Sequence, residues 1–203
     1  PIRSSAASDV YKRQDLASAW KPDFKTIVIG NLTVGGTGKT PLVIWLANEL
    51  KKEGFYPGIV SRGYKSTANN NPVLITQSSN PSDVGDEPLI IFNNTNCPVV
   101  VGANRVRAAK HLIQNRQCNV LISDDGLQHF KLGRDIEIAM IDGMRKFGNN
   151  LLLPAGPLRE PIKKLEQVDF VINTNTFHSK EAESKENNFL MTYKPISVSY
   201  THL

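Results

Sequence analysis

Residues 25–53 hold the side chains with the clearest chemical potential, in the order KTIVIGNLTVGGTGKTPLVIWLANELKKE. The glycines permit backbone dihedrals that other residues avoid, so that amide N–H groups can point at a phosphate. The Lys39 ammonium can then reach the β- and γ-phosphates of a nucleotide, and the Thr40 hydroxyl can ligate the Mg²⁺ that bridges them. We therefore predict a phosphate-binding loop formed by Thr33, Val34, Gly35, Gly36, Thr37, Gly38, Lys39 and Thr40.

The residues on either side of this loop decide between a nucleotide site and a glycine-rich linker. An apolar β-branched run at 26–29 predicts a strand before the loop, and apolar residues at helical spacing predict an amphipathic helix after it. Pro41 fits the first helical turn, where its missing N–H is not needed. One position departs from the general pattern G-x-x-x-x-G-K-[ST], because Thr33 stands where the first glycine is expected. The flanking strand and helix favour nucleotide binding.

A second informative stretch, NVLISDDGLQHF, occupies residues 119–130. A buried-type strand ends there in Asp124 and Asp125, where P-loop NTPases place an acid near Mg²⁺. Two adjacent carboxylates repel each other unless a cation compensates them, which favours a metal role over a turn. His129 lies just beyond, and packing is slightly favoured over substrate contact for its side chain.

Several other polar residues have both a structural and a functional interpretation. Asp86 opens a predicted helix in the sequence DVGDEP, and an N-capping role is favoured over catalysis from the residues alone. Residues 62–65, RGYK, follow a predicted strand at the end where ligands bind in open α/β sheets, and a ligand contact and a solvated turn are equally supported. Arg105, Arg107 and Lys110 are expected to face solvent on one side of a helix.

The remaining pattern alternates short apolar strands with helices. Strands are predicted at 26–29, 58–61, 73–76, 98–101, 120–123, 136–141 and 169–173, and helices after the loop and at 87–94 and 104–115. Residues 151–161, LLLPAGPLREP, predict a rigid loop because of their glycine and proline bends. Repeated strand–helix units indicate an α/β fold of the P-loop NTPase type, with three layers and a mostly parallel central sheet.

Composition fits one globular domain, or one domain and part of another. The net charge of +5 arises within residues 1–65, which carry ten Lys and Arg against five Asp and Glu. This bias suits anionic phosphates or lipid surfaces but is too mild to indicate nucleic-acid binding. No apolar run reaches the length of a membrane span. Cys97 and Cys118 lack metal-binding spacing and are expected to be free thiols in a reducing compartment, the cytoplasm.

Five segments together resemble one enzyme family. The loop GNLTVGGTGKTP is followed by SRGY, VGDEP, SDDGLQH and LLPAGPLREP, in the order found in the tetraacyldisaccharide 4′-kinases, the lipid A 4′-kinases of Gram-negative bacteria. The resemblance extends from about residue 27 to residue 173 and includes the threonine at position 33. It implies that ATP and Mg²⁺ are bound and that the γ-phosphate is transferred to the 4′-hydroxyl of a tetraacylated glucosamine disaccharide 1-phosphate. It also implies peripheral contact with the cytoplasmic face of the bacterial inner membrane.

The resemblance implies roles for the residues already singled out. Lys39 takes the place of the family's phosphate-binding lysine, and Thr40 that of its magnesium threonine. Asp124 and Asp125 take the places of the acidic pair near the metal.

The same resemblance implies roles for three residues outside these two motifs. Asp86 matches the aspartate proposed to deprotonate the acceptor hydroxyl, which overturns the N-cap preference, although one residue can do both. Arg159 and Glu160 match the Arg-Glu pair of the PLRE motif and are expected to steady the transferred phosphate and the metal, respectively.

The family's N-terminal membrane-contacting segment and second lobe are not recognised in this sequence. Residues 1–14 and the final SVSYTHL look like foreign or disordered sequence. We expect residues 15–178 to form the P-loop kinase domain and residues 179–203 to be a linker or the start of the second lobe. The chain is therefore expected to be a fragment that binds Mg·ATP with little or no transfer to the lipid.

Two other functions use a similar loop. A P-loop GTPase or ParA-like switch would act through partner binding, but a GTPase needs an N/T-K-x-D motif, and VINTN at 171–175 lacks its lysine and aspartate. A soluble small-molecule kinase is a closer rival, against which only the ordered set of motifs argues.

Overall fold

A computed structural model describes residues 19–63, 71–174 and 187–192 and places eight strands of these residues in one sheet. The order across the sheet is β3-β4-β2-β5-β1-β6-β7-β8, and neighbouring strands are parallel except β3 with β4. The strands are β1 (Lys25–Asn31), β2 (Pro57–Ser61), β3 (Val73–Leu74), β4 (Val99–Val101), β5 (Val120–Asp124), β6 (Ile136–Asp142), β7 (Phe170–Thr174) and β8 (Asn188–Met191). The predicted α/β class with a mostly parallel sheet is confirmed.

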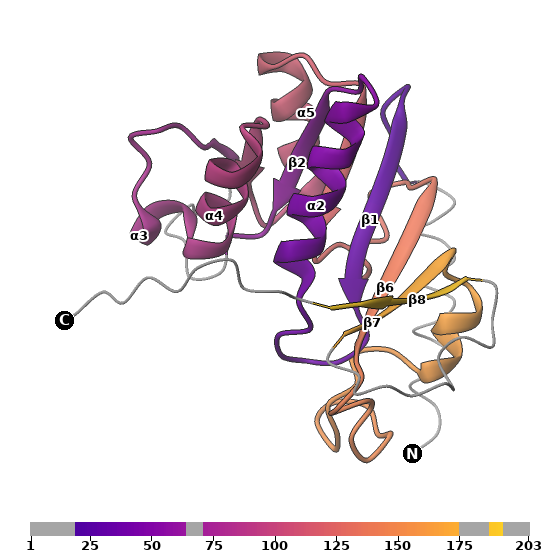
Figure 1. Ribbon diagram of the computed structural model, residues 1–203. Helices are drawn as coiled ribbons and strands as arrows, with labels where there is room; N and C mark the ends of the chain where they lie inside the picture. Colours follow the sequence, from indigo (N-terminus) through magenta and orange to yellow (C-terminus); the bar gives the residue numbers. More distant parts are fainter. Residues whose placement is uncertain (1–18, 64–70, 175–186, 193–203) are drawn as a thin grey trace.

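Helices pack on both faces of this sheet (Figure 1). They are α2 (Lys39–Lys52), α3 (Pro81–Val84), α4 (Asp86–Thr95), α5 (Arg105–Asn115) and the 3₁₀ helix η1 (Ile162–Glu166). Side chains of β1 alternate between the faces, as the two-residue period of a strand requires. Ile27 and Ile29 belong to the apolar cluster that contains the buried residues of α2, whereas Val28 packs with Leu127 and Leu158 on the opposite face. This burial on both sides fixes the strand that leads into the predicted phosphate-binding loop.

The parallel strands bring distant parts of the chain to one edge of the sheet. β1 ends at Asn31, and its neighbours β5 and β6 end at Asp124 and Asp142. β7, which lies beside β6, ends at Thr174. Because the carboxyl ends of parallel strands meet at the same edge, the loop after β1 lies among the residues that follow these strands.

The elements differ from the sequence prediction in four places. β3 covers two residues instead of the four predicted at 73–76, and it runs antiparallel to β4. The short helix α3, the 3₁₀ helix η1 and the strand β8 were not predicted. β8 lies within residues 179–203, which the sequence assigned to a linker or a second lobe, and it pairs with β7. Residues 1–14 lie outside the described part of the chain, so the predicted tail stays a prediction.

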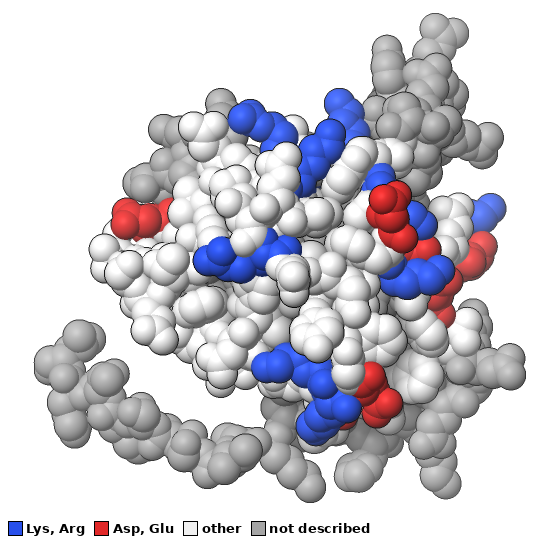
Figure 2. All heavy atoms as spheres, turned by 90° about the horizontal axis from the view of Figure 1, so that it is seen from above, with Lys and Arg blue, Asp and Glu red and all other residues white. Residues whose placement is uncertain are grey.

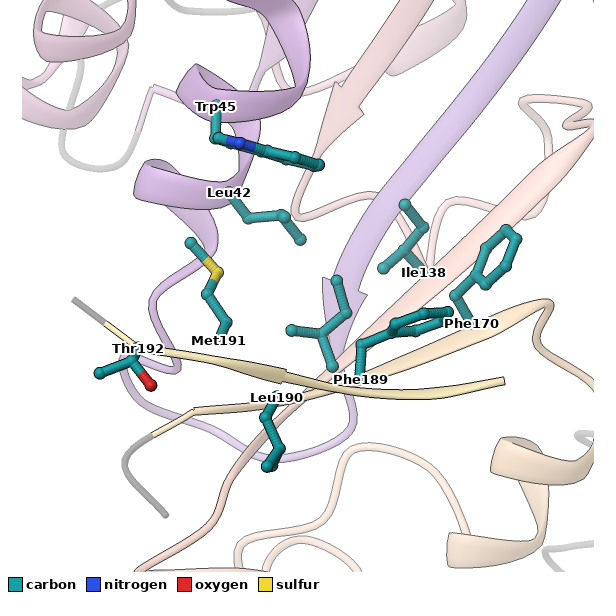
Figure 3. Close-up of a pocket in the computed structure, with 9 residues that line it drawn as sticks. Leu42, Trp45, Ile138, Phe170, Phe189, Leu190, Met191 and Thr192 are labelled. Carbon is teal, nitrogen blue, oxygen red and sulfur yellow. The ribbon is translucent and has the colours of Figure 1, made fainter. Parts of the chain in front are cut away.

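An apolar groove of about 630 Å³ lies between α2 and the strands β6, β7 and β8 (Figure 3). Leu42 and Trp45 of α2 border it on one side, and Met191 of β8 borders it on the other. Trp45 is 55% exposed and Phe189 is 49% exposed, although both are large and apolar. The face of the sheet that α2 covers is thus only partly covered over β7 and β8.

Charged side chains on the face opposite the loop form separate small groups. Figure 2 shows this face, at the amino ends of the parallel strands, with Lys and Arg beside Asp and Glu at the right and bottom of the view, other Lys and Arg surrounded by uncharged residues, and most of the surface uncharged. None of the described helices is both long and apolar enough to cross a membrane.

Candidate nucleotide and phosphoryl-transfer site

The predicted phosphate-binding loop connects the end of β1 to the start of α2 (Figure 1). Gly35 and Gly38 have φ angles of 104° and 79°, in the left-handed region that favours glycine. α2 begins at Lys39, directly after Gly38, and spans 14 residues. The amino end of a long helix therefore stands behind the loop, where its dipole favours a bound anion.

Asn31, the last residue of β1, holds the inside of the loop. Its Nδ2 donates hydrogen bonds to the carbonyl oxygens of Thr33 at 2.8 Å and Gly35 at 3.2 Å. Its Oδ1 accepts a hydrogen bond from Lys39 Nζ at 3.1 Å. One buried side chain thus contacts both the loop backbone and the lysine that follows it.

Two further side chains bind the next carbonyl oxygens of the loop. Arg145 donates to the carbonyl oxygen of Gly36, and its Nε also donates to Asp142 Oδ2 at 2.9 Å. The Thr174 hydroxyl, at the end of β7, donates to the carbonyl oxygen of Thr37 at 3.2 Å. The ends of β6 and β7 therefore support the side of the loop that faces them.

The predicted rigid loop at 151–161 packs directly against the phosphate-binding loop. Val34 N donates to the carbonyl oxygen of Pro157 at 2.9 Å, and Arg159 N donates to the carbonyl oxygen of Leu32 at 2.6 Å. These backbone bonds join two segments that are more than a hundred residues apart in the sequence. They bring Arg159 and Glu160 to the edge of the sheet that carries Lys39.

Asp124 is the buried member of the acidic pair. Its Oδ2 accepts a hydrogen bond from the Ser61 hydroxyl at 2.9 Å, whereas its Oδ1 is buried and has no hydrogen-bond partner among the described residues. Burial raises the pKa of Asp124, because the charged carboxylate loses its hydration there. An orphaned carboxylate oxygen inside a protein is costly, and a bound cation would compensate that cost.

Asp125 is the member of the pair that contacts cationic side chains. Its Oδ1 lies 3.4 Å from Lys39 Nζ, and both of its carboxylate oxygens lie 3.1 Å from Arg159 Nη1. Burial raises the pKa of Asp125, but the charges of Lys39 and Arg159 outweigh this and hold the pKa below its ordinary value. Asp125 also has φ of 49°, a left-handed conformation that aspartate tolerates better than most residues. The carboxylate is therefore ionised and fixed between two cations.

Gln128 completes a closed ring of polar contacts. Its Nε2 donates to the carbonyl oxygen of Asn31 at 3.2 Å, and its Oε1 accepts from Arg159 Nη1 at 3.3 Å. The ring runs from Lys39 to Asn31, Gln128, Arg159 and Asp125 and back to Lys39. It links the phosphate-binding loop, the acidic pair and the Arg-Glu pair through Gln128, a residue that the sequence reasoning did not single out.

Glu160 is buried next to this ring, with 3% of its surface exposed. Its Oε1 accepts a hydrogen bond from Gln128 Nε2 at 2.9 Å. Gln128 thus connects Glu160 to the ring of polar contacts.

Asp86 stands apart from these residues. It is exposed as the first residue of α4, and the N-cap position belongs to Gly85. The N-cap interpretation is therefore wrong, because the helix starts one residue earlier than a capping aspartate would require. Within the described parts of the chain, no hydrogen bond or ion pair joins Asp86 to the loop, the acidic pair or Arg159.

For three other candidates, namely Thr40, the RGYK segment and His129, the structure gives the burial of their described residues but no side-chain hydrogen bond or ion pair of these with the ring. Thr40 is half-buried in the first turn of α2, and Arg62 is exposed after β2. Tyr64 and Lys65 of the RGYK segment lie outside the described residues. His129 is half-buried, and burial followed by the positive charge of Arg105 lowers its pKa to about 4, so its imidazole is neutral near pH 7.

The prediction that Arg105 faces solvent is wrong. It is 2% exposed, and its guanidinium donates to the carbonyl oxygens of Gly102 at 2.6 Å and Asp124 at 3.1 Å. Burial lowers its pKa to about 10, so it still carries its charge near neutral pH. Helical spacing alone could not distinguish this arginine from Arg107, which is exposed on the same helix.

The donors around the loop fit a divalent cation together with nucleotide phosphates. Among the described residues, no group of three or more His, Cys, Asp or Glu could hold a metal alone. Mg²⁺ usually takes one or two protein carboxylates and fills its remaining positions with water and phosphate oxygens. Asp124, with its orphaned oxygen, and the adjacent Asp125 match that requirement.

Sequence reasoning found the loop, the acidic pair and the Arg-Glu pair, but it missed the side chains that connect them. Asn31, Gln128, Arg145 and Thr174 carry no charge pattern or glycine spacing that marks a site. Asn31 and Thr174 end two of the parallel strands, which is the one signal that could have found them.

Comparisons with known proteins agree with this geometry. A family model described as Tetraacyldisaccharide-1-P 4'-kinase matches residues 4–202. A tetraacyldisaccharide 4'-kinase from Coxiella burnetii (strain RSA 331 / Henzerling II) is 58% identical over 146 residues, which are 72% of this chain and 45% of that protein. One from Hamiltonella defensa is 45% identical over 183 residues, which are 90% of this chain and 54% of that protein. The chain spans about half the length of the curated relatives it matches.

A solved structure is similar as well. The crystal structure of the "apo" form of LpxK from Aquifex aeolicus in complex with ATP has a TM-score of 0.75 and 29% sequence identity to this chain. The similarity covers 92% of this chain and 59% of that one.

Proposed function

Because this chain belongs to the tetraacyldisaccharide-1-P 4'-kinase family, we propose that it takes part in the transfer of the ATP γ-phosphate to the 4′-hydroxyl of a tetraacylated disaccharide 1-phosphate. One observation carries the proposal. Lys39 of the loop and Arg159 of the PLRE segment both contact the carboxylate of Asp125, at 3.4 and 3.1 Å. Three separate motifs therefore meet at one carboxylate, which supports a shared site for phosphate and metal.

The loop and Lys39 bind the phosphates of ATP in this proposal. The loop amides and the amino end of α2 supply the electrostatic field for an anion, and Lys39 supplies a full positive charge. Arg159 lies close enough to Lys39 to steady the transferred phosphate, because both approach the same carboxylate. The name of the ATP complex of the Aquifex aeolicus protein supports ATP as the nucleotide.

Thr40, Asp124, Asp125 and Glu160 are the residues that would hold Mg²⁺. The bound ion would neutralise the charge that develops on the phosphates during transfer. Asp124 supplies an oxygen that otherwise has no partner, and Glu160 is buried beside the cluster.

Asp86 acts as the base in this proposal. As the acceptor 4′-oxygen forms its bond to the γ-phosphorus, the bond from that phosphorus to the bridging oxygen of ADP breaks, and the hydroxyl proton passes to Asp86. The exposure of Asp86 is compatible with this role, because an incoming acceptor can reach its carboxylate.

The acceptor is a lipid, so we further propose peripheral contact with the cytoplasmic face of the bacterial inner membrane. The positive net charge of +5 suits an anionic lipid surface.

The test measures binding and transfer separately. Mg·ATP binding to the chain is followed by isothermal titration, and phosphate transfer is followed with γ-labelled ATP and lipid acceptor. Transfer is assayed in this chain and, with matching substitutions, in the full-length Coxiella burnetii relative. We expect Lys39→Ala to abolish transfer and weaken ATP binding strongly, whereas Asp86→Ala lowers turnover with ATP affinity little changed.

Two results would overturn the proposal. If the unaltered chain bound no Mg·ATP, the nucleotide site would be wrong. Equal loss of ATP binding in the Lys39 and Asp86 variants would contradict the division of roles. GTP is the control ligand, because a GTPase switch would bind GTP more tightly than ATP.

A further inference from the structure

We propose that Asn31 is a positioning residue that sets both the shape of the phosphate-binding loop and the place of the Lys39 ammonium. The inference rests on the proposed function, because it concerns how the same nucleotide site is organised. Asn31 is fully buried at the end of β1, and its side-chain amide meets three polar groups of the loop region.

The two donor bonds of Asn31 orient the loop backbone. They hold the carbonyl oxygens of Thr33 and Gly35 at 2.8 and 3.2 Å from Nδ2, so these oxygens point towards β1. An anion site needs the opposite groups, the amide hydrogens, to point towards the ligand. Holding the carbonyl oxygens at the rear of the loop keeps their negative ends away from the phosphates.

The acceptor bond of Asn31 orients Lys39. The Lys39 ammonium lies 3.1 Å from Asn31 Oδ1 and 3.4 Å from Asp125 Oδ1. A neutral amide aligns the ammonium without cancelling its charge, whereas a further carboxylate would compete with the phosphates for it. Asn31 therefore holds Lys39 without adding a further carboxylate to those of Asp124 and Asp125, which already interact with its charge.

Asparagine suits this position better than other residues of its size. Its amide supplies two N–H donors and one acceptor oxygen, and all three are used here. Aspartate has the same shape but no donor when ionised, so it would put a carboxylate oxygen against the carbonyl oxygen of Thr33 or Gly35. Alanine would leave two loop carbonyl oxygens and the lysine without this partner.

The main-chain oxygen of Asn31 extends the same organisation to the other motifs. It accepts a hydrogen bond from Gln128 Nε2 at 3.2 Å, and Gln128 in turn contacts Arg159 and Glu160. A shift of Asn31 would therefore displace both the phosphate-binding loop and, through Gln128, the Arg-Glu pair.

The experiment compares Asn31→Ala and Asn31→Asp with the unaltered chain by isothermal titration of Mg·ATP. We expect each variant to weaken binding by roughly ten- to a hundredfold, the range for hydrogen bonds that involve a charged group. Asn115→Ala is the matched control, because Asn115 also donates from Nδ2 to a backbone carbonyl oxygen, that of His111, but is exposed as the last residue of α5. The control is expected to bind Mg·ATP within twofold of the unaltered chain.

A double-mutant cycle separates positioning of Lys39 from a general structural effect. Asn31→Ala is expected to weaken ATP binding less in a Lys39→Ala background, because part of its action passes through the lysine. A purely structural role would weaken binding by the same factor in both backgrounds, which would overturn the assignment to Lys39.

The failure of this inference differs from the failure of the proposed function. If the unaltered chain bound Mg·ATP and both folded Asn31 variants bound it within twofold, the inference would be wrong while the nucleotide site stood. If neither variant folded, the side-chain amide resonances of Asn31 in the unaltered chain would decide. They are expected to shift when Mg·ATP binds, and unchanged resonances at saturating Mg·ATP would overturn the inference.

Discussion

The guanidinium of Arg105 donates a hydrogen bond to the main-chain oxygen of Asp124 at 3.1 Å, so a buried cation lies directly behind the acidic pair. A second bond, to the carbonyl oxygen of Gly102 at 2.6 Å, ties the same guanidinium to the residue after β4. Arg105 therefore fixes the start of α5 to the end of β5. This contact gives the acidic pair a rigid rear support that the sequence did not reveal.

Arg105→Ala is expected to destabilise the fold by roughly 1–3 kcal/mol for each carbonyl oxygen that it leaves unsatisfied. Chemical denaturation of the ligand-free chain measures this loss. Arg107→Ala is the matched control on the same helix, and its exposed side chain predicts a change within about 0.5 kcal/mol. Equal effects of the two substitutions would show that the buried contacts of Arg105 contribute no more to stability than an exposed arginine.

Asp124→Asn should separate stability from function. The amide keeps the shape of the carboxylate, and the Ser61 hydroxyl can accept from it as readily as it now donates. Because the neutral amide removes the desolvation that raises the pKa of Asp124, the ligand-free chain is expected to gain unfolding free energy. Isothermal titration should show that Mg²⁺ no longer tightens ATP binding. A variant that kept the full Mg²⁺ effect would contradict the assignment of Asp124 to the metal.

The lowered pKa of Asp135 implies that the protein loses stability in acid. Desolvation raises its pKa, but the hydrogen bonds from Lys21, Thr26 N and Lys25 outweigh this and lower the pKa to about 2 from 3.8. A depressed pKa means that this stabilisation is present above about pH 3.8 and is lost as the pH falls towards 2. Urea unfolding measures the free energy of unfolding of Asp135→Asn and of the unaltered chain. The difference between the two is expected to be largest at about pH 5 and to vanish near pH 2, where the carboxylate is protonated.

The control for this prediction is Asp23→Asn, because Asp23 is an exposed carboxylate just before β1. Its difference from the unaltered chain is expected to stay within about 0.5 kcal/mol at pH 5. A constant difference between Asp135→Asn and the unaltered chain at every pH would mean that charge plays no part in the Asp135 contacts.

The apolar groove beside α2 should bind a hydrophobic dye in the native state. Trp45 and Phe189 are about half exposed within it, so the double variant Trp45→Ala/Phe189→Ala is expected to lose most of the dye fluorescence. Met144→Ala removes an apolar side chain that is 67% exposed elsewhere and should leave the signal unchanged. Equal signals from all variants would place the dye outside the groove.

The loop and the acidic pair could be predicted because their chemistry depends on local order along the chain. Glycines before Lys39 and aspartates after an apolar run indicate a phosphate and metal site from neighbouring residues alone, without knowledge of distant contacts. Arg105 could not be predicted, since its burial depends on the carbonyl oxygen of Asp124, 19 residues away. The roles of Asn31 and Gln128 could not be predicted either, because the hydrogen bonds of an amide side chain depend on the groups that folding brings next to it.

The outer elements were harder to predict for a different reason. β8 spans only four residues, Asn, Phe, Leu and Met, and directly follows a polar and charged run of the sequence. So short an apolar run shows no clear strand period, and its pairing with β7 supplies the hydrogen bonds that make it a strand. Asp86 was misplaced by one position, because the helix boundary depends on Gly85, which has a φ of 89° and ends α3 as α4 begins.

The interior position of β1 also determines how long its hydrogen bonds persist. β1 and β5, which lead into the phosphate loop and the acidic pair, each have a parallel neighbour on both sides, whereas β3 and β8 stand at the ends of the strand order. Backbone amides of such interior strands exchange their hydrogens with solvent when the whole domain opens, while outer strands exchange by local fraying. The strands that lead into the phosphate loop and the acidic pair are therefore expected to persist until the domain unfolds, even while β3 and β8 fray.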